Sequence, residues 1–200
     1  GLAMLTGCMG PQAGQWLYTL GVNKPPKTAA QFQLPKKPLL ILVDDDRELA
    51  QPSTICDFLV DSLAKELRDH GLVDRVTTPE ELARLRQNEP KFDRRGAREI
   101  GRMVNADTVL WLMVTRYALE TNLEWAASPG SFGVSVKVID ATSEKRENVR
   151  LWPTNTEGKQ VEVQLSVHEV RKAKNLREAQ QKLADTLAIQ VAKLFYEYQE

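Results

Sequence analysis

A chain of 200 residues, 42% of them hydrophobic, is long enough to bury one substantial core and suits one domain with a tail. Its 27 basic and 27 acidic residues cancel, so the clustered positive charge that a nucleic-acid partner requires is not expected. The sequence has no run of about 18 apolar residues and therefore predicts no membrane-spanning helix. Its 27% of charged residues, beside many aliphatic ones, predict a folded chain.

A short motif at the amino terminus is the first feature in chain order. Apolar residues 2–5 lead into Leu5-Thr6-Gly7-Cys8, and the small residues before the cysteine suit a peptidase that binds extended chain. This motif resembles the lipobox of bacterial lipoproteins, in which the cysteine sulfur takes a diacylglycerol and cleavage makes the cysteine the first residue. The resemblance implies that residues 1–7 are the end of a signal peptide and that Cys8 carries the lipid.

The lipid on Cys8 is expected to be the membrane attachment of this chain. Two or more acyl chains hold a protein stably, because each buried CH₂ contributes about 0.8 kcal/mol. Met9 stands where the inner-membrane retention signal of lipoproteins would place an aspartate. The resemblance therefore implies the periplasmic face of the outer membrane in the bacterial cell envelope.

Residues 8–38 are expected to form the lipidated cysteine and a proline-rich tether, because prolines interrupt regular structure throughout this stretch. The prolines are Pro11, Pro25, Pro26, Pro35 and Pro38. A flexible tether of about 30 residues spans roughly 30 Å. Gln15–Val22 is too apolar for a pure linker, so we expect it to pack on the domain or on a neighbour.

Residues 39–200 are expected to form a single α/β domain whose first half alternates strands and helices and whose second half is mostly strands. The predicted elements, in order, are a strand at Leu39–Val43, a helix from Thr54, a strand at Val73–Val76, a helix from Thr78, a helix containing Ile100, strands at Thr108–Leu119, Phe132–Val138, Asn148–Trp152 and Val161–Val167, and a closing helix from Asn175. Successive strands without helices between them indicate an antiparallel meander. The predicted fold class is α/β (α+β), a mixed sheet with an antiparallel meander flanked by helices.

Two segments carry a more specific resemblance. Asn105-Ala106-Asp107-Thr108-Val109 leads into a long strand, and Val134–Thr142 precedes a strand that ends at Trp152. These segments resemble the group of CsgG, LpoB and the TolB N-terminal domain, and the similarity covers about residues 38–198. Ser143 follows Thr142 where that group usually has glycine.

Those relatives are envelope proteins, and several are lipoproteins. The resemblance implies a membrane-anchored envelope lipoprotein whose domain binds or regulates another envelope protein. The alternative is a structural subunit of a homo-oligomeric envelope or secretion assembly. A membrane pore is not expected, because one hairpin of a barrel needs more than about 20 residues and the turn at Ser143–Asn148 is short.

The run from Leu40 to Glu48 also resembles the start of a response-regulator receiver domain, in which carboxylates such as Asp44, Asp45 and Asp46 would bind Mg²⁺. Leu112 would then occupy the phosphoacceptor position, and leucine cannot be phosphorylated. This receiver-like reading is the minor alternative, and the carboxylates are expected to lie in a solvated loop without metal.

The sequence contains no motif for another kind of catalysis or for cofactor binding. The chain has no G-x-S-x-G setting, no Walker loop and no G-x-G-x-x-G. Cys56 lies in an apolar helical stretch, where an inert buried thiol is expected. We therefore expect no catalytic residues, no cofactor and no enzyme activity.

The segment between the two long strands supplies the candidate partner contact. Leu123 and Trp125 precede Pro129-Gly130, which marks a turn, so both side chains are expected to project from a hairpin tip. Tryptophan is enriched among residues that dominate binding energy. The alternative is that Trp125 folds over the sheet edge as a lid on the core.

Overall fold

The computed structural model describes residues 27–145 and 149–199. Cys8, Gln15–Val22, the tether as far as residue 26, and Asn148 lie outside the described residues. Residues 30–196 form one compact unit. A second unit contains residues 27–29 and 197–199, where Thr28 and Tyr198 pair through two backbone hydrogen bonds of 2.8 and 3.1 Å.

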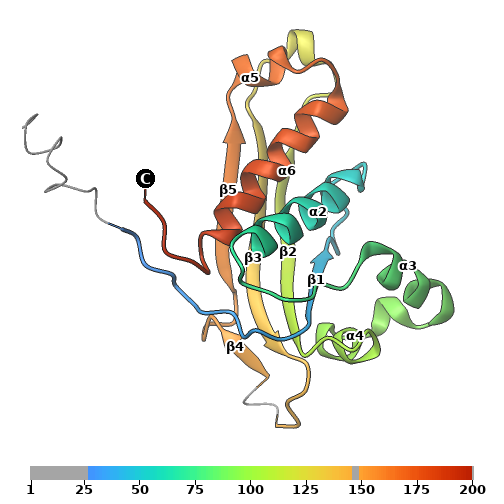
Figure 1. Ribbon diagram of the computed structural model, residues 1–200. Coiled ribbons are helices and arrows are strands. Elements are labelled where there is room, and N and C mark those ends of the chain that lie inside the picture. The colour runs from blue at the N-terminus through green and yellow to red at the C-terminus, as the bar shows by residue number, and fades with distance from the viewer. Residues whose placement is uncertain (1–26, 146–148, 200) are drawn as a thin grey trace, which may run out of the picture. The chain divides into compact units, whose positions relative to one another are not determined.

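One mixed sheet of five strands forms the frame of the larger unit. The strands are β1 (Leu39–Asp44), β2 (Thr108–Ala118), β3 (Gly130–Asp140), β4 (Arg150–Trp152) and β5 (Lys159–Leu165). The order is β1-β2-β3-β4, with β5 also paired to β3, and among the described strands only β1 pairs in parallel. The predicted fold class, a mixed sheet with an antiparallel part and flanking helices, is confirmed (Figure 1).

The last two strands share one edge of β3. Trp152 of β4 lies opposite Val138, and Lys159 of β5 lies opposite Val136, so β4 and β5 follow each other along the same neighbour. β4 and β5 therefore do not pair with each other, so they do not continue the predicted meander. The intervening turn contains Gly158 at φ 88°, a backbone conformation that glycine adopts readily.

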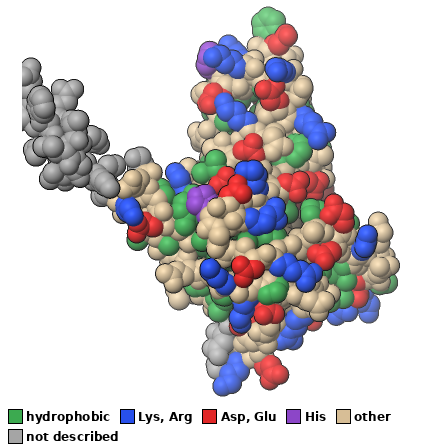
Figure 2. Space-filling view, in the orientation of Figure 1, with side chains coloured by type: hydrophobic (Ala, Val, Ile, Leu, Met, Phe, Trp, Pro, Cys, Tyr) green, Lys and Arg blue, Asp and Glu red, His purple; other side chains and the backbone are tan. Residues whose placement is uncertain are grey.

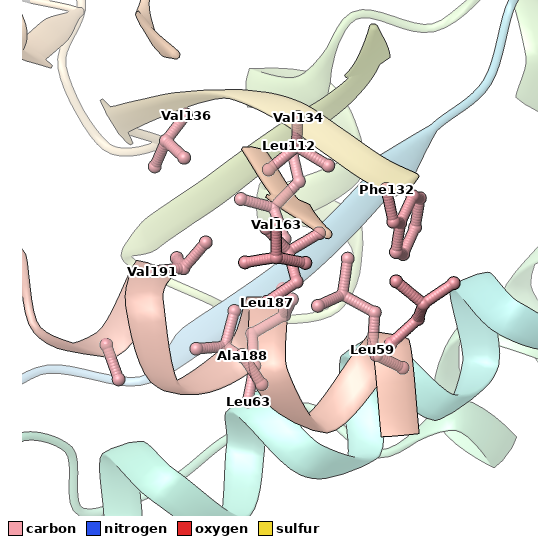
Figure 3. Close-up of a cluster of buried hydrophobic side chains, with 14 of the residues drawn as sticks. Leu59, Leu63, Leu112, Phe132, Val134, Val136, Val163, Leu187, Ala188 and Val191 are labelled. Atoms are coloured by element: carbon pink, nitrogen blue, oxygen red, sulfur yellow. The ribbon is translucent and has the colours of Figure 1, made fainter. Parts of the chain in front are cut away.

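Two long helices cover one face of the sheet. In α2 (Thr54–Asp69), apolar residues at helical spacing face inward, and Asn175 caps α6 (Leu176–Ala192) by accepting a hydrogen bond from Glu178 N. Figure 3 shows side chains of both helices interlocking with those of β2, β3 and β5. Leu34 is also buried in this core, so the packed domain begins before residue 39.

The opposite face carries a smaller core under α3 (Pro79–Asn88) and α4 (Ala97–Met103), with the short 3-10 helix η1 (Phe92–Arg94) between them. The strand predicted at Val73–Val76 is wrong, because this segment forms only a single bridge, from Val76 to Leu39. In the described part of the chain, no helix is long and apolar enough to cross a membrane.

A short helix missing from the sequence prediction follows β5. The strand ends at Leu165 because Ser166 starts α5 (Val167–Lys172). Ser166 and Glu169 bond each other's backbone N–H groups, which forms a capping box. A second 3-10 helix, η2 (Leu123–Trp125), lies between β2 and β3.

Candidate partner-binding site

The two residues predicted to contact a partner both lie in η2, yet they have opposite environments. Leu123 is 8% exposed and belongs to the main core, whereas Trp125 is 76% exposed. An extended hairpin would place both on one side, but a 3-10 helix has about three residues per turn, so positions two apart point in different directions. Leu123 therefore does not project from the tip, and Trp125 does not form a lid on the core.

The turn that carries Trp125 is held from two sides. Ala126 is fully buried, and the Glu120 carboxylate accepts hydrogen bonds from the N–H groups of Ala127 and Ser128 at 2.9 and 2.8 Å. From α5, Arg171 Nε donates to the carbonyl oxygen of Ala126 at 3.0 Å. Trp125 is thus presented on a turn whose backbone is fixed by neighbouring elements.

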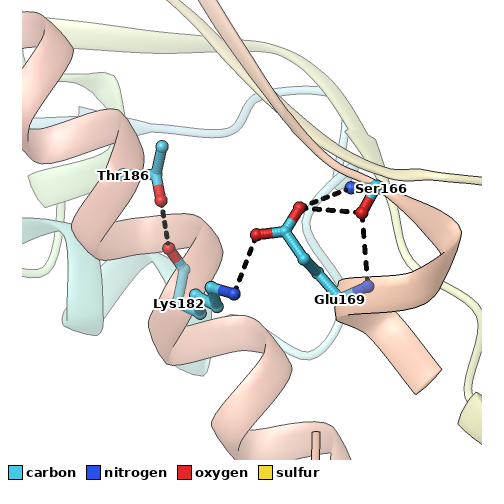
Figure 4. A network of polar contacts seen from close by, with 4 residues as sticks. All are labelled: Ser166, Glu169, Lys182 and Thr186. Atoms are coloured by element: carbon cyan, nitrogen blue, oxygen red, sulfur yellow. Dashed lines mark hydrogen bonds and ion pairs between the residues drawn. The ribbon is translucent and has the colours of Figure 1, made fainter. Parts of the chain in front are cut away.

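The helix α5 is in turn fixed to α6 by a polar network (Figure 4). Lys182 Nζ lies 2.9 Å from the Glu169 carboxylate, which also accepts bonds from the Ser166 N–H and hydroxyl. The Lys182 hydrogen bond and the bonds from Ser166 lower the pKa of Glu169 to about 2. This network connects α6 through α5 to the turn of Trp125, which we name the Trp125 tip (residues 120–128).

Charge is evenly distributed near these elements. In the view of Figure 2, acidic and basic side chains are interspersed over the surface. Two basic residues of and after α5 take part in local contacts: Arg171 bonds Ala126, and Arg177 lies over the ring of Phe58 at 5.3 Å. No broad field of one sign is visible on this face.

The carboxylates that follow β1 border a cavity of about 830 Å³, which we name the β1 cavity. Its lining includes Leu40 and Ile41 of β1, Asp44–Asp46, Val60 of α2 and Leu82 of α3. Asp45 has a local structural role, because its carboxylate accepts hydrogen bonds from Leu49 N at 2.9 Å and Ala50 N at 2.8 Å.

Burial raises the pKa values of three other titratable groups around this cavity, Asp44, Cys56 and Asp57. Burial raises the pKa of Asp44, and Asp46 raises it further, although the Trp111 indole N–H donates to Asp44 at 3.3 Å. Burial also raises the pKa of Asp57, and Asp61 adds to this. Burial raises the pKa of the Cys56 thiol to about 12, so this thiol stays protonated near neutral pH.

The receiver resemblance would place metal binding at Asp44–Asp46 and phosphoryl transfer at the position of Leu112. Among residues 27–145 and 149–199, no three His, Cys, Asp or Glu side chains are grouped as metal ligands. Leu112, at the phosphoacceptor position of that comparison, is fully buried in the main core.

No protein-family model matches the chain, and no curated protein is similar to it in sequence. Among solved structures it is similar to a dodecameric PelC variant from Paraburkholderia phytofirmans, with 17% identity and a TM-score of 0.49, covering 86% of this chain and 99% of that chain. It is also similar to lipoprotein GNA1162 from Neisseria meningitidis, with 13% identity, a TM-score of 0.42, and 79% and 97% of the two chains covered.

A third similar structure is the LpoB C-terminal domain from Salmonella enterica. It shares 13% identity at a TM-score of 0.39, over 78% of this chain and 93% of that chain. This domain comes from the group that the sequence motifs resemble, and membership of that group stays a prediction. Because the three TM-scores lie below 0.5, the fold class rests on the strands and helices themselves.

Three features were not predicted from the sequence: the helix α5, the contact from Arg171 to Ala126, and the β1 cavity. The helix α5 had a usable signal, because Ser166 followed by Glu169 three residues later is a capping-box pattern. The contact from Arg171 to Ala126 had none, because it joins residues 45 positions apart. The β1 cavity likewise depends on how α2 and α3 pack around one strand.

Proposed function

We propose that this chain is a non-catalytic lipoprotein of the bacterial envelope, anchored through lipid on Cys8, whose domain binds another envelope protein through the Trp125 tip. The observation that carries the proposal is Trp125, 76% exposed on a turn fixed by its neighbours. The lipobox at Leu5–Cys8 supports the anchor and a position at the periplasmic face of the outer membrane.

The fixed backbone of the Trp125 tip lowers the entropic cost of binding a partner. Association normally costs the entropy of ordering loops and side chains at the interface. Here Leu123 and Ala126 are already buried and Glu120 already bonds the following backbone, so a partner would meet an ordered turn. An indole presented in this way offers a large apolar surface at little entropic cost.

A second candidate function is a subunit of a homo-oligomeric envelope assembly. The observation that favours it is β5, an edge strand of seven residues that pairs only with β3 among the described strands. An open strand edge can pair with another chain. In this case the partner of the domain would be a second copy of the same chain.

The test is site-specific photo-crosslinking in membranes that contain the full precursor. A benzophenone amino acid at position 125 should give one discrete crosslinked product. The same group at Ile189, an apolar side chain of α6 that is 38% exposed, serves as the matched control and should give none. A crosslink from position 125 to a different protein supports the first candidate, and no product from position 125 would contradict an interface at the Trp125 tip. The second candidate is tested with the same group at Gln164, an exposed residue of β5, where a crosslinked dimer of this chain would support it and no dimer would contradict it.

The anchor is tested separately with Cys8→Ser. The variant should lose labelling by a fatty-acid analogue and should leave the signal peptide uncleaved or the protein mislocalised. A mature protein that still carries the label would contradict attachment through Cys8.

A further inference from the structure

A basic side chain beside the Trp125 tip is fixed through only one of its nitrogens. Arg171 Nε donates to the carbonyl oxygen of Ala126, the residue that directly follows Trp125, at 3.0 Å. An arginine side chain carries five N–H donors, and this bond uses one of them. Within the described part of the chain, the two terminal NH₂ groups of Arg171 have no hydrogen bond or ion pair. Because Arg171 is exposed, a ligand can reach these four N–H donors.

The acidic side chains of the tip and of α5 do not supply Arg171 with a carboxylate partner. Glu169 is bound by Lys182, and Glu120 accepts hydrogen bonds from two backbone N–H groups of the tip. Glu124 is exposed and makes no ion pair with Arg171. A carboxylate from outside the chain would therefore not have to displace an internal ion pair in order to bind the guanidinium.

The position of the Arg171 side chain is set before any ligand arrives. Its Nε bond restricts the guanidinium to the surface next to Trp125, and the Lys182–Glu169 contact holds α5 itself (Figure 4). A long side chain that is ordered only on binding loses conformational freedom at that moment, and this weakens the complex. Arg171 has already lost part of that freedom in the folded chain.

The shape of the group and the charge around it favour a carboxylate of a protein. The planar guanidinium forms two parallel hydrogen bonds with a carboxylate, and it binds phosphate in the same way. Attraction to the phosphates of an anionic membrane requires several clustered cations. Here Glu124 is exposed on the same short helix as Trp125, and such a surface would repel it. One aspartate or glutamate side chain needs no wide positive surface.

We propose that Arg171 is the carboxylate-binding residue of the Trp125 tip: an aspartate or glutamate of the partner protein binds its terminal NH₂ groups while the indole of Trp125 enters an apolar socket. This inference rests on the proposed function and deepens it, since it names the chemistry of the partner surface. Tryptophan and arginine are both enriched among the residues that dominate binding energy. The paired charges would also fix the orientation in which the partner docks.

The test variant supplies a carboxylate to Arg171 from within the chain. His168 is exposed, lies three residues before Arg171 on α5, and has no hydrogen bond or ion pair among the described residues. Residues at this spacing are neighbours on a helix surface. His168→Glu should therefore occupy the terminal NH₂ groups and leave the Nε bond to Ala126 intact. His168→Gln, which has the same length without the charge, is the matched control. Substitution of Arg171 is less informative, because it also removes the bond to Ala126.

The readout is the photo-crosslink from position 125 in membranes that contain the full precursor. His168→Glu should lower the yield of the protein crosslink about tenfold, and His168→Gln should match the wild type. The wild-type yield should also fall when salt rises from about 0.05 to about 0.5 M. Both variants should melt within about 2 °C of the wild type, because position 168 is exposed. Equal yields in the two variants, or a wild-type yield that does not change with salt, would overturn the proposal.

The outcomes separate this contact from the proposed function. A protein crosslink that keeps its wild-type yield in His168→Glu would overturn the carboxylate contact and leave the Trp125 tip as an interface. No protein product from the wild-type sequence around position 125 would refute the proposed function, and this contact with it. A phospholipid adduct at position 125 in place of a protein product, identified by its mass, would assign the guanidinium to lipid phosphate and overturn the proposed class of partner.

Discussion

The sharpest prediction compares alanine substitutions at two neighbouring positions of η2. Leu123 is 8% exposed and Trp125 is 76% exposed, although only one residue separates them. Leu123→Ala removes a buried side chain, which typically costs about 2–5 kcal/mol. A single 3-10 turn near the end of a sheet can partly collapse around the deletion, so the low end, about 2–3 kcal/mol, is expected.

Trp125→Ala should behave as a surface substitution despite removing the larger side chain. Substitutions away from the core usually change the free energy of unfolding by less than about 0.5 kcal/mol. For a chain of this size, about 1 kcal/mol corresponds to about 2–4 °C in Tm. Leu123→Ala should therefore lower Tm by about 4–12 °C, and Trp125→Ala by less than about 2 °C.

Partner binding should show the reverse order. If Trp125 anchors the interface, its truncation should cost about 2 kcal/mol or more in binding, which is roughly a thirtyfold loss of affinity. Calorimetric melting and copurification of each variant from crosslinked membranes provide the two measurements. A Tm for Trp125→Ala as low as that for Leu123→Ala would show that the indole packs on the core, and the reasoning would be refuted.

Two further predictions concern charged side chains. Lys137 is 7% exposed, and its ammonium lies over the ring of Trp111 at 5.0 Å and beside Met113. Among the described residues it has no acidic partner. Lys137→Met should therefore raise the free energy of unfolding by roughly 1 kcal/mol in a denaturant titration. Burial lowers the pKa of Lys137, so the stability of the wild type should rise as pH rises through the lowered pKa toward 10.5. The same rise of stability with alkaline pH in Lys137→Met would contradict this. The pKa of Glu169 is lowered to about 2, so its contribution to stability is present above pH 4.5 and is lost as pH falls toward 2. Glu169→Gln keeps a capping side chain, and its acid titration should show a shallower loss of stability than the wild type. An unchanged acid profile would contradict the contact with Lys182.

The secondary structure was predictable wherever local pattern and packing agree. Alternation at Phe132, Val134, Val136 and Val138 placed β3 because these residues all face the main core. Residues 73–76 show the opposite case. They have strand-like composition, yet they meet only Leu39 at one bridge, since the chain enters α3 at its N-cap Thr78, two residues after Val76.

The candidate site was predictable only in part, and the reason is the sequence distance of its contacts. The sequence singled out Trp125 from residue type and a nearby turn, and this needed only local information. Its exposure depends on Leu123 turning inward and on Arg171, which reaches Ala126 from 45 residues away. The carboxylates after β1 were also visible in the sequence, but the burial that raises the pKa of Asp44 depends on how residues far apart in the chain pack around it.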